Sequence, residues 1–199
     1  MRPTLQRVLR SAACLCMLLP LAACAAPTHF SLETIGESET GAFVCPAVAF
    51  GATAQEAEQA LDADLKPYME TDGVTALQTE GGALGDRATP LYLEFQDGAL
   101  YSVYTTWRAG EADDAPTGAD FDALYSRAVE RFGAPTTSKV NEPLVAPDGT
   151  DYGVAVTEHI WVRETPDSIT QCHLVMDTQG GAVSLISLIL NTRPPDAAG

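Results

Sequence analysis

Three side chains in the C-terminal half are of types that could bind a metal ion. His159 and His173 fall in expected neighbouring strands, and Cys172 directly precedes His173. Metal sites usually use closely paired ligands such as Cys-x-x-Cys, and these residues lack that spacing. Successive strand residues alternate between faces, so Cys172 and His173 point in opposite directions. The pattern predicts no metal site and no cofactor, and favours partly exposed strand histidines.

Nucleophilic catalysis is the second chemistry to consider, with Cys172 as nucleophile and His159 as base. A reactive thiol needs exposed, electropositive surroundings and a third group that orients the base. Cys172 lies instead in an apolar run of an acidic chain. The sequence contains no Gly-x-Ser-x-Gly, Ser-x-x-Lys or His-Glu-x-x-His motif. We therefore predict no catalytic residue and expect a protein that is not an enzyme.

Acidic residues cluster in two loops, at Glu111, Asp113 and Asp114 and at Asp148-Gly149-Thr150-Asp151. A glycosidase pair would need one carboxyl shielded in a cleft, and a calcium loop needs a different spacing of acids. Solvated acidic loops are the better interpretation.

Aromatic residues are frequent in the expected strands. Alternation places Tyr92 and Tyr104 opposite their main apolar neighbours. If helices cover one sheet face, the other could present aromatics to a ligand or partner. Ordinary cross-strand packing is the alternative. The candidate binding residues are Tyr92, Tyr104, Trp107 and Trp161.

The N-terminus carries Arg2, Arg7 and Arg10, followed by an apolar run over residues 11–21. That run is shorter than the roughly 20 residues needed to span a bilayer. It ends in Leu21-Ala22-Ala23-Cys24, which resembles the lipobox of bacterial lipoprotein precursors. The resemblance implies attachment of a diacylglyceryl group to the Cys24 thiol, cleavage before Cys24, and often acylation of the new amine. Cleavage after Ala25, as in an ordinary secretory peptide, remains the alternative.

A lipid on Cys24 would place the protein outside the cytoplasm, anchored to a membrane. Ala25 follows Cys24, where an aspartate would, in this family, retain the protein in the inner membrane. The resemblance therefore implies the outer membrane of a two-membrane bacterium, or the cell surface of a single-membrane one. In that compartment Cys45 and Cys172 could form a disulfide, or both could be small buried hydrophobes.

The net charge of −16 limits the possible partners. Removing residues 1–23 would remove three arginines and no acid, making the mature chain still more acidic. Nucleic acids and anionic lipid head groups require a basic surface, so neither is an expected ligand. An unknown protein or small molecule remains, besides the membrane that holds the lipid.

The chain divides into four expected segments: a signal peptide (1–23), a lipid-anchored flexible tether (24–42), one domain (43–191) and a disordered tail (192–199). Residues 43–50 form a short apolar run with Pro46, typical of an edge strand or an extended lead-in. Thr53-Ala54-Gln55-Glu56 fits a capping box, which predicts a helix from Ala54 to about Leu65.

A β-hairpin is the clearest strand signal. Runs at 91–95 and 100–107 flank an Asp97-Gly98 turn, preceded by a short strand at 74–77 and a loop at 81–88. Apolar residues from Phe121 to Phe132 recur at helical spacing, before Gly133 and Pro135. We then expect a loop at 139–152 and strands at 153–163, 169–176 and 182–191.

This order predicts an α+β fold with two layers, an antiparallel sheet packed by two helices. The two helix-then-strands units could be diverged copies of one motif. The element order over residues 43–191 loosely resembles small envelope lipoproteins, namely the small outer-membrane-assembly lipoproteins and the β-lactamase-inhibitor-protein-like domains. No shared motif accompanies it, so it implies no functional residue.

The sequence thus predicts a non-enzymatic, lipid-anchored extracytoplasmic binding or interaction lipoprotein. An envelope assembly or structural factor is the alternative, and an uncharacterised hydrolase is the third hypothesis.

Lipidation has a direct test. Mass spectrometry of the purified mature N-terminus should find an acylated Cys24, because the lipobox directs modification and cleavage at that residue. An unmodified N-terminus at Ala26 or later would contradict the prediction.

Overall fold

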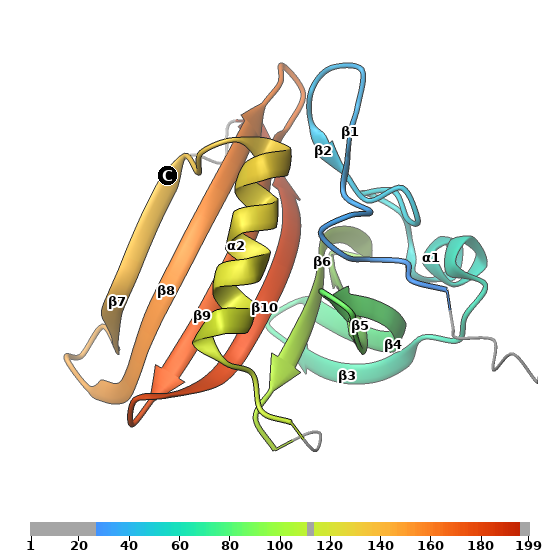
Figure 1. Cartoon of the computed structure of the whole chain (residues 1–199). Helices are drawn as coiled ribbons and strands as arrows, with labels where there is room; N and C mark the ends of the chain where they lie inside the picture. The colour runs from blue at the N-terminus through green and yellow to red at the C-terminus, as the bar shows by residue number, and fades with distance from the viewer. Residues whose placement is uncertain (1–26, 111–113, 196–199) are drawn as a thin grey trace, which may run out of the picture.

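The protein is an α+β fold dominated by an eight-stranded antiparallel sheet, accompanied by two helices (Figure 1). The computed structural model describes residues 27–110 and 114–195. The expected signal peptide, Cys24, two of the three acids of the first acidic loop and the last four residues therefore lie outside the described residues.

The helices are α1 (Ala54–Leu61) and α2 (Gly118–Phe132). The large sheet contains β3 (Lys66–Thr71), β4 (Val74–Leu84), β5 (Arg87–Gln96), β6 (Ala99–Arg108), β7 (Thr137–Val145), β8 (Asp151–Glu164), β9 (Ile169–Gln179) and β10 (Ala182–Arg193). A separate pair joins β1 (Gly36–Glu37) to β2 (Phe43–Val44).

The strand order is β3-β4-β5-β6-β10-β9-β8-β7. Each half of the sheet is a run of four consecutive strands that follows one helix. The halves meet where β6 pairs with β10, with Thr105 opposite Leu188 near the middle of the pairing. The first strand of each run, β3 in one half and β7 in the other, therefore lies at an edge of the sheet.

Both helices begin with the capping box that their sequences contain. Thr53 and Glu56 cap α1, and Thr117 and Asp120 cap α2, each pair satisfying two backbone N–H groups. The first helix ends four residues earlier than expected, because Asp62 adopts a left-handed conformation with φ of 50°. The second helix confirms the predicted one and buries four apolar side chains, Phe121, Leu124, Ala128 and Phe132.

Helix α2 lies across β8, β9 and β10 (Figure 1). The Tyr125 ring stacks on His159 of β8 with centroids 4.1 Å apart. Trp161 is fully buried two residues further on, and its Nε1 donates to the carbonyl of Gly133 at 2.8 Å. This face of the sheet thus belongs to the core.

The flexible tether expected over residues 24–42 is wrong for its described part. Phe30, Leu32 and Ile35 are buried in the core. The N–H of Phe30 donates to Gly81, and its carbonyl accepts from Ala83, where β4 bulges. Burying each of these three apolar side chains contributes roughly 1.5–3 kcal/mol of favourable free energy, which is enough to hold the segment against the domain.

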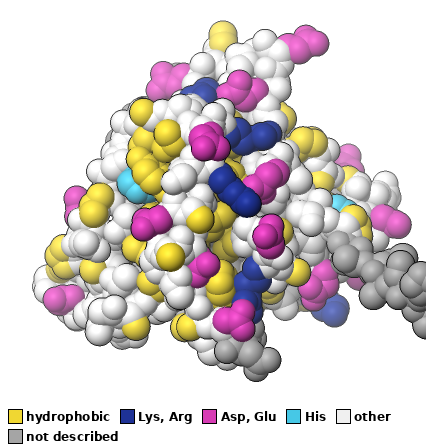
Figure 2. Space-filling model, viewed as in Figure 1, with side chains coloured by type: hydrophobic (Ala, Val, Ile, Leu, Met, Phe, Trp, Pro, Cys, Tyr) yellow, Lys and Arg dark blue, Asp and Glu magenta, His cyan; other side chains and the backbone are white. Residues whose placement is uncertain are grey.

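Ion pairs and hydrogen bonds hold the same segment from outside. Arg127 of α2 lies 3.2 Å from Glu33, and Arg131 donates to the carbonyl of Ile35 at 2.6 Å. Figure 2 shows basic side chains gathered down the middle of this side of the molecule, interleaved with acidic ones. The Arg127–Glu33 pair is half exposed, so it adds little stability beside the buried apolar contacts.

The hairpin around Asp97-Gly98 is confirmed as β5 and β6, both turn residues having positive φ. Several boundaries are wrong. The loops expected at 81–88 and 139–152 are largely strand, in β4, β5, β7 and β8; only residues 43–44 of the run 43–50 are strand, and β10 continues to Arg193 into the expected tail. Strands β3 and β7 are exposed along their whole length, so they lack the alternation that identifies a half-buried strand.

Candidate functional site

The face of the sheet opposite α2 carries a continuous row of side chains, which we call the transverse row. Strand alternation puts Tyr92 and Tyr104 on this face, away from buried Leu91 and Leu93. The pairing register connects one residue from every strand: Lys66, Gln78, Tyr92, Tyr104, Ile189, His173, Ile160 and Thr137. Most of its central members are partly exposed, so this face can contact another molecule.

Three tyrosines form an aromatic stack in the first half of the row. The rings of Tyr92 and Tyr104 are nearly parallel, with centroids 4.8 Å apart, and Tyr68 leans on Tyr92 at 4.7 Å. Tyr68 is 42% exposed, whereas Tyr92 between its neighbours is only 4% exposed. Burial and the nearby Glu94 carboxylate raise the pKa of Tyr104, so its hydroxyl stays protonated. The stack offers a rigid apolar surface with hydroxyl groups.

In the second half of the row, apolar residues surround a histidine, and charged side chains lie beside it. Ile189 and Ile160 flank His173, whose Nδ1 lies 2.8 Å from a Glu158 oxygen. Lys139 approaches the other oxygen of Glu158 at 3.8 Å. Within the described part of the chain, the buried Nε2 of His173 has no hydrogen-bond partner. The His173 ring is therefore oriented by Glu158 and mostly buried, with 15% of its side chain exposed.

A cavity of about 420 Å³ lies beside the tyrosine stack, and we call it the arginine cavity. Its volume is within the usual range of small-molecule sites. The charged, aromatic and buried hydroxyl residues that line it are Tyr68, Arg87, Thr89, Tyr92, Thr106, Trp107 and Arg108. Among the described residues that line this cavity, none is Asp or Glu.

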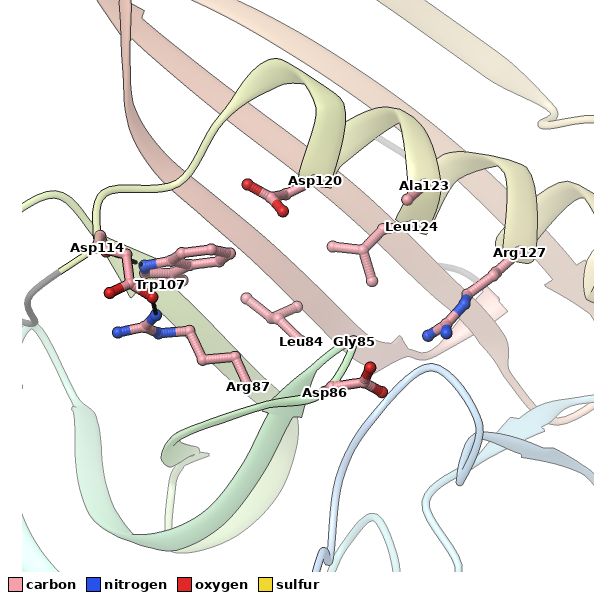
Figure 3. Close-up of a pocket in the computed structure, with 10 residues that line it drawn as sticks. All are labelled: Leu84, Gly85, Asp86, Arg87, Trp107, Asp114, Asp120, Ala123, Leu124 and Arg127. Carbon is pink, nitrogen blue, oxygen red and sulfur yellow. Dashed lines mark hydrogen bonds and ion pairs between the residues drawn. The ribbon is translucent and has the colours of Figure 1, made fainter.

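Arg87 and Trp107 form the wall between this cavity and a second one of about 500 Å³. The Arg87 guanidinium carbon lies 4.4 Å from the centre of the Trp107 ring. Asp114 joins them, since its carboxylate is 2.8 Å from Arg87 Nη1 and its carbonyl accepts from Trp107 Nε1 at 3.1 Å (Figure 3). The second cavity, beside α2, also contains Asp86 and Asp120, so its charges are mixed.

Thr106 and its neighbour Thr105 differ in one respect that bears on the arginine cavity. Thr105 is fully buried on the core face, where its hydroxyl bonds to Thr89 and to the carbonyl of Pro90. Thr106 is 3% exposed on the opposite face, and its buried hydroxyl has no partner among the described residues. A hydroxyl of this kind costs stability unless a ligand satisfies it.

The expected aromatic surface is partly wrong. Trp161 is under α2 with no exposed surface, so it contributes to the core and cannot contact a ligand. The sequence pattern could not show which face the helix would cover. In the other half of the sheet, Tyr92 and Trp107 do line one cavity, the arginine cavity, and Tyr104 stacks on Tyr92.

The two cysteines are free and buried, so the disulfide alternative is wrong in this structure. Burial raises the pKa of the Cys172 thiol to about 12, and burial likewise raises the pKa of Cys45. Neither thiol can supply a thiolate at neutral pH.

A serine and a histidine meet at the edge of the sheet. Ser138 Oγ lies 2.8 Å from Nδ1 of His159, an arrangement typical of a nucleophile and its base. Among the described residues, however, no carboxylate bonds to His159, and Tyr125 covers one side of its ring. Burial lowers the pKa of His159, so the ring is neutral at pH 7. The pair is better explained as a contact between β7 and β8.

His159, His173 and Cys172 do not converge. His159 lies under α2, and His173 is in the transverse row on the other face. In the described part of the chain, no three His, Cys, Asp or Glu side chains are grouped to hold a metal ion. Sequence reasoning missed Arg87 and Arg108. The only available signal was that two of the few basic residues flank the predicted aromatic hairpin.

Comparison of the chain with family models, curated proteins and solved structures found no significant match. Within the described residues, no helix has the length and apolar character needed to cross a membrane.

The two adjacent threonines provide a matched prediction. Thr105→Val should lower the free energy of unfolding by about 1–3 kcal/mol, because it leaves Thr89 and a buried carbonyl without a partner. Thr106→Val should leave the free energy of unfolding unchanged or raise it by up to about 1 kcal/mol, because valine has the shape of threonine but lacks the unsatisfied hydroxyl. Urea unfolding followed by tryptophan fluorescence measures both. An equally large loss in Thr106→Val would contradict the assignment.

Proposed function

We propose that this protein is a non-enzymatic, lipid-anchored binding lipoprotein that acts outside the cytoplasm and holds its partner against the face of the sheet opposite α2. The observation that carries the proposal is the transverse row, which crosses all eight strands without interruption. Its tyrosines are rigid and amphipathic, as are the side chains that dominate binding surfaces.

We also infer a two-layer arrangement, in which both helices and residues 27–50 cover one face and leave the other to the partner. Burial of Ala57, Leu61 and the α2 side chains in one apolar cluster supports it. The two halves of the sheet are inferred to be diverged copies of one unit. Their equivalent capping boxes, and the matching turns Gln96-Asp97-Gly98-Ala99 and Gln179-Gly180-Gly181-Ala182, support this origin.

The lipobox supports attachment through Cys24, which would hold the domain close to a membrane. The buried thiols and the absence of a carboxylate at the Ser138–His159 pair, among the described residues, favour binding over hydrolysis. An envelope assembly factor would use the same sheet face but would remain in a stoichiometric complex with a membrane protein.

Photo-crosslinking in the producing cells tests the proposed face. Tyr104→p-azidophenylalanine places the probe in the middle of the transverse row with little change of shape. Intact-mass analysis of the purified protein should show one adduct of defined mass, whether the partner is a protein or a small molecule. Detergent co-purification then separates the alternatives, since a stable stoichiometric membrane complex identifies an assembly factor.

Ser126→p-azidophenylalanine is the matched control, because Ser126 is exposed on α2. It should yield no defined adduct. Equal labelling from the two positions, or no adduct from position 104, would contradict binding at this face.

A further inference from the structure

The arginine cavity has a chemical character that differs from the rest of the protein. The chain contains 27 acidic and 11 basic residues. Yet the described lining of this cavity includes two arginines and no acid. Asp114 pairs with Arg87 and Asp177 lies near Arg108, but neither aspartate lines the cavity. The described wall therefore presents guanidinium groups and no carboxylate to a ligand, which favours an anionic group.

Arg87 is held in place on the wall of the cavity. Its guanidinium lies over the Trp107 ring at 4.4 Å, and one of its nitrogens bonds to Asp114. A guanidinium has five N–H donors, so these contacts leave donors for a ligand. An arginine held by stacking and an ion pair loses little entropy on binding, which favours recognition of a planar anion.

Arg108 supplies the second charge. It lies close enough to Tyr104 and Asp177 to lower the pKa of both groups, against the larger raising effect of burial. It is exposed, as expected for a side chain at the mouth of a cavity. A guanidinium can bind both oxygens of a carboxylate, so either arginine of this cavity could hold the group and the other would add charge.

The remaining lining residues indicate what the anion is attached to. Tyr68 and Trp107 present aromatic surface to the cavity, which packs best against a flat apolar group, and nearly buried Tyr92 supports Tyr68 from behind. Thr106 adds a nearly buried hydroxyl that has no partner among the described residues. A simple inorganic anion would use the arginines and leave the aromatic surfaces uncovered.

We propose that the arginine cavity binds a carboxylate carried on a planar aromatic group. The aromatic part lies against Tyr68 and Trp107, and the carboxylate bonds to Arg87 and Arg108. This rests on the proposed function, because it names the chemistry recognised at one end of the transverse row. The carboxylate belongs either to a free small molecule or to the aromatic C-terminal residue of a peptide.

Isothermal titration calorimetry of the mature lipoprotein in detergent, with an empty-micelle blank, tests the proposal. The probes are 2-naphthoate for a free ligand and an alanyl-phenylalanine dipeptide for a peptide end. Each has an uncharged counterpart, 2-naphthamide and the dipeptide amide. At least one carboxylate should bind saturably and about tenfold or more tightly than its amide, because charged hydrogen bonds to arginine are lost in the amide. The probe that binds identifies the source.

Variants locate the binding. Arg108→Gln should weaken carboxylate binding about tenfold or more, and Arg193→Gln should leave it unchanged. Arg193 is exposed at the C-terminal end of β10, whereas Arg108 pairs with Leu185 near the start of that strand. The Arg193 variant therefore loses the same charge at a distant place. Thermal unfolding of both variants confirms that they are folded. Should Arg108→Gln be unstable, Trp107→Leu removes the aromatic wall instead and should also weaken binding.

Three results would overturn the proposal: no saturable binding of either carboxylate at millimolar concentration, equal affinity for the amides, or equal effects of Arg108→Gln and Arg193→Gln. If position 104 still crosslinks a partner in cells, the binding face stands and only the ligand chemistry is wrong. If that crosslink is also absent, the proposed function fails as well.

Discussion

The pairing of β6 with β10 is the contact on which the rest of the structure depends. Every other neighbouring pair in the described large sheet joins strands that are consecutive in the chain. The β6–β10 pairing instead joins two halves separated by α2 and three strands, so it carries the largest cost in loop-closure entropy. Buried Val103, Ile186 and Leu190 offset that cost on the core face. Without this pairing there would be two smaller sheets, each with another exposed edge.

Two surfaces with different roles follow from this one pairing. On the core face, buried apolar residues from both halves form one cluster that also includes Phe30 and Ile35. On the opposite face, Tyr104 lies beside Ile189, so the transverse row passes from one half to the other. The arginine cavity sits in the first half, next to the tyrosine stack. The proposed binding face therefore spans both halves, whereas the arginine cavity is lined by residues of the first half alone.

Local signals in the sequence predicted the local parts of this fold. Thr53 with Glu56 marked the start of a helix, and Asp97-Gly98 marked a hairpin, because each motif is decided by residues close in the chain. The edge strands were missed because Pro67 and Pro143 interrupt polar, fully exposed segments. Phe30, Leu32 and Ile35 were missed because three apolar residues in a polar stretch show no clear period. The burial of Trp161 and the placement of Arg87 and Arg108 around one cavity depend on register and helix placement across the sheet, which single-sequence patterns do not contain.

Amide hydrogen exchange, read residue by residue by NMR, tests the central claim that the eight strands form one continuous sheet. The backbone amides that bond β6 to β10, within residues 102–108 and 185–191, should be as strongly protected as those in the centre of β9. They should also exchange far more slowly than the outward amides of β3 and β7. Exchange at the β6–β10 pairing as fast as at those edges would show that the halves separate, and it would contradict a single sheet with one uninterrupted binding face.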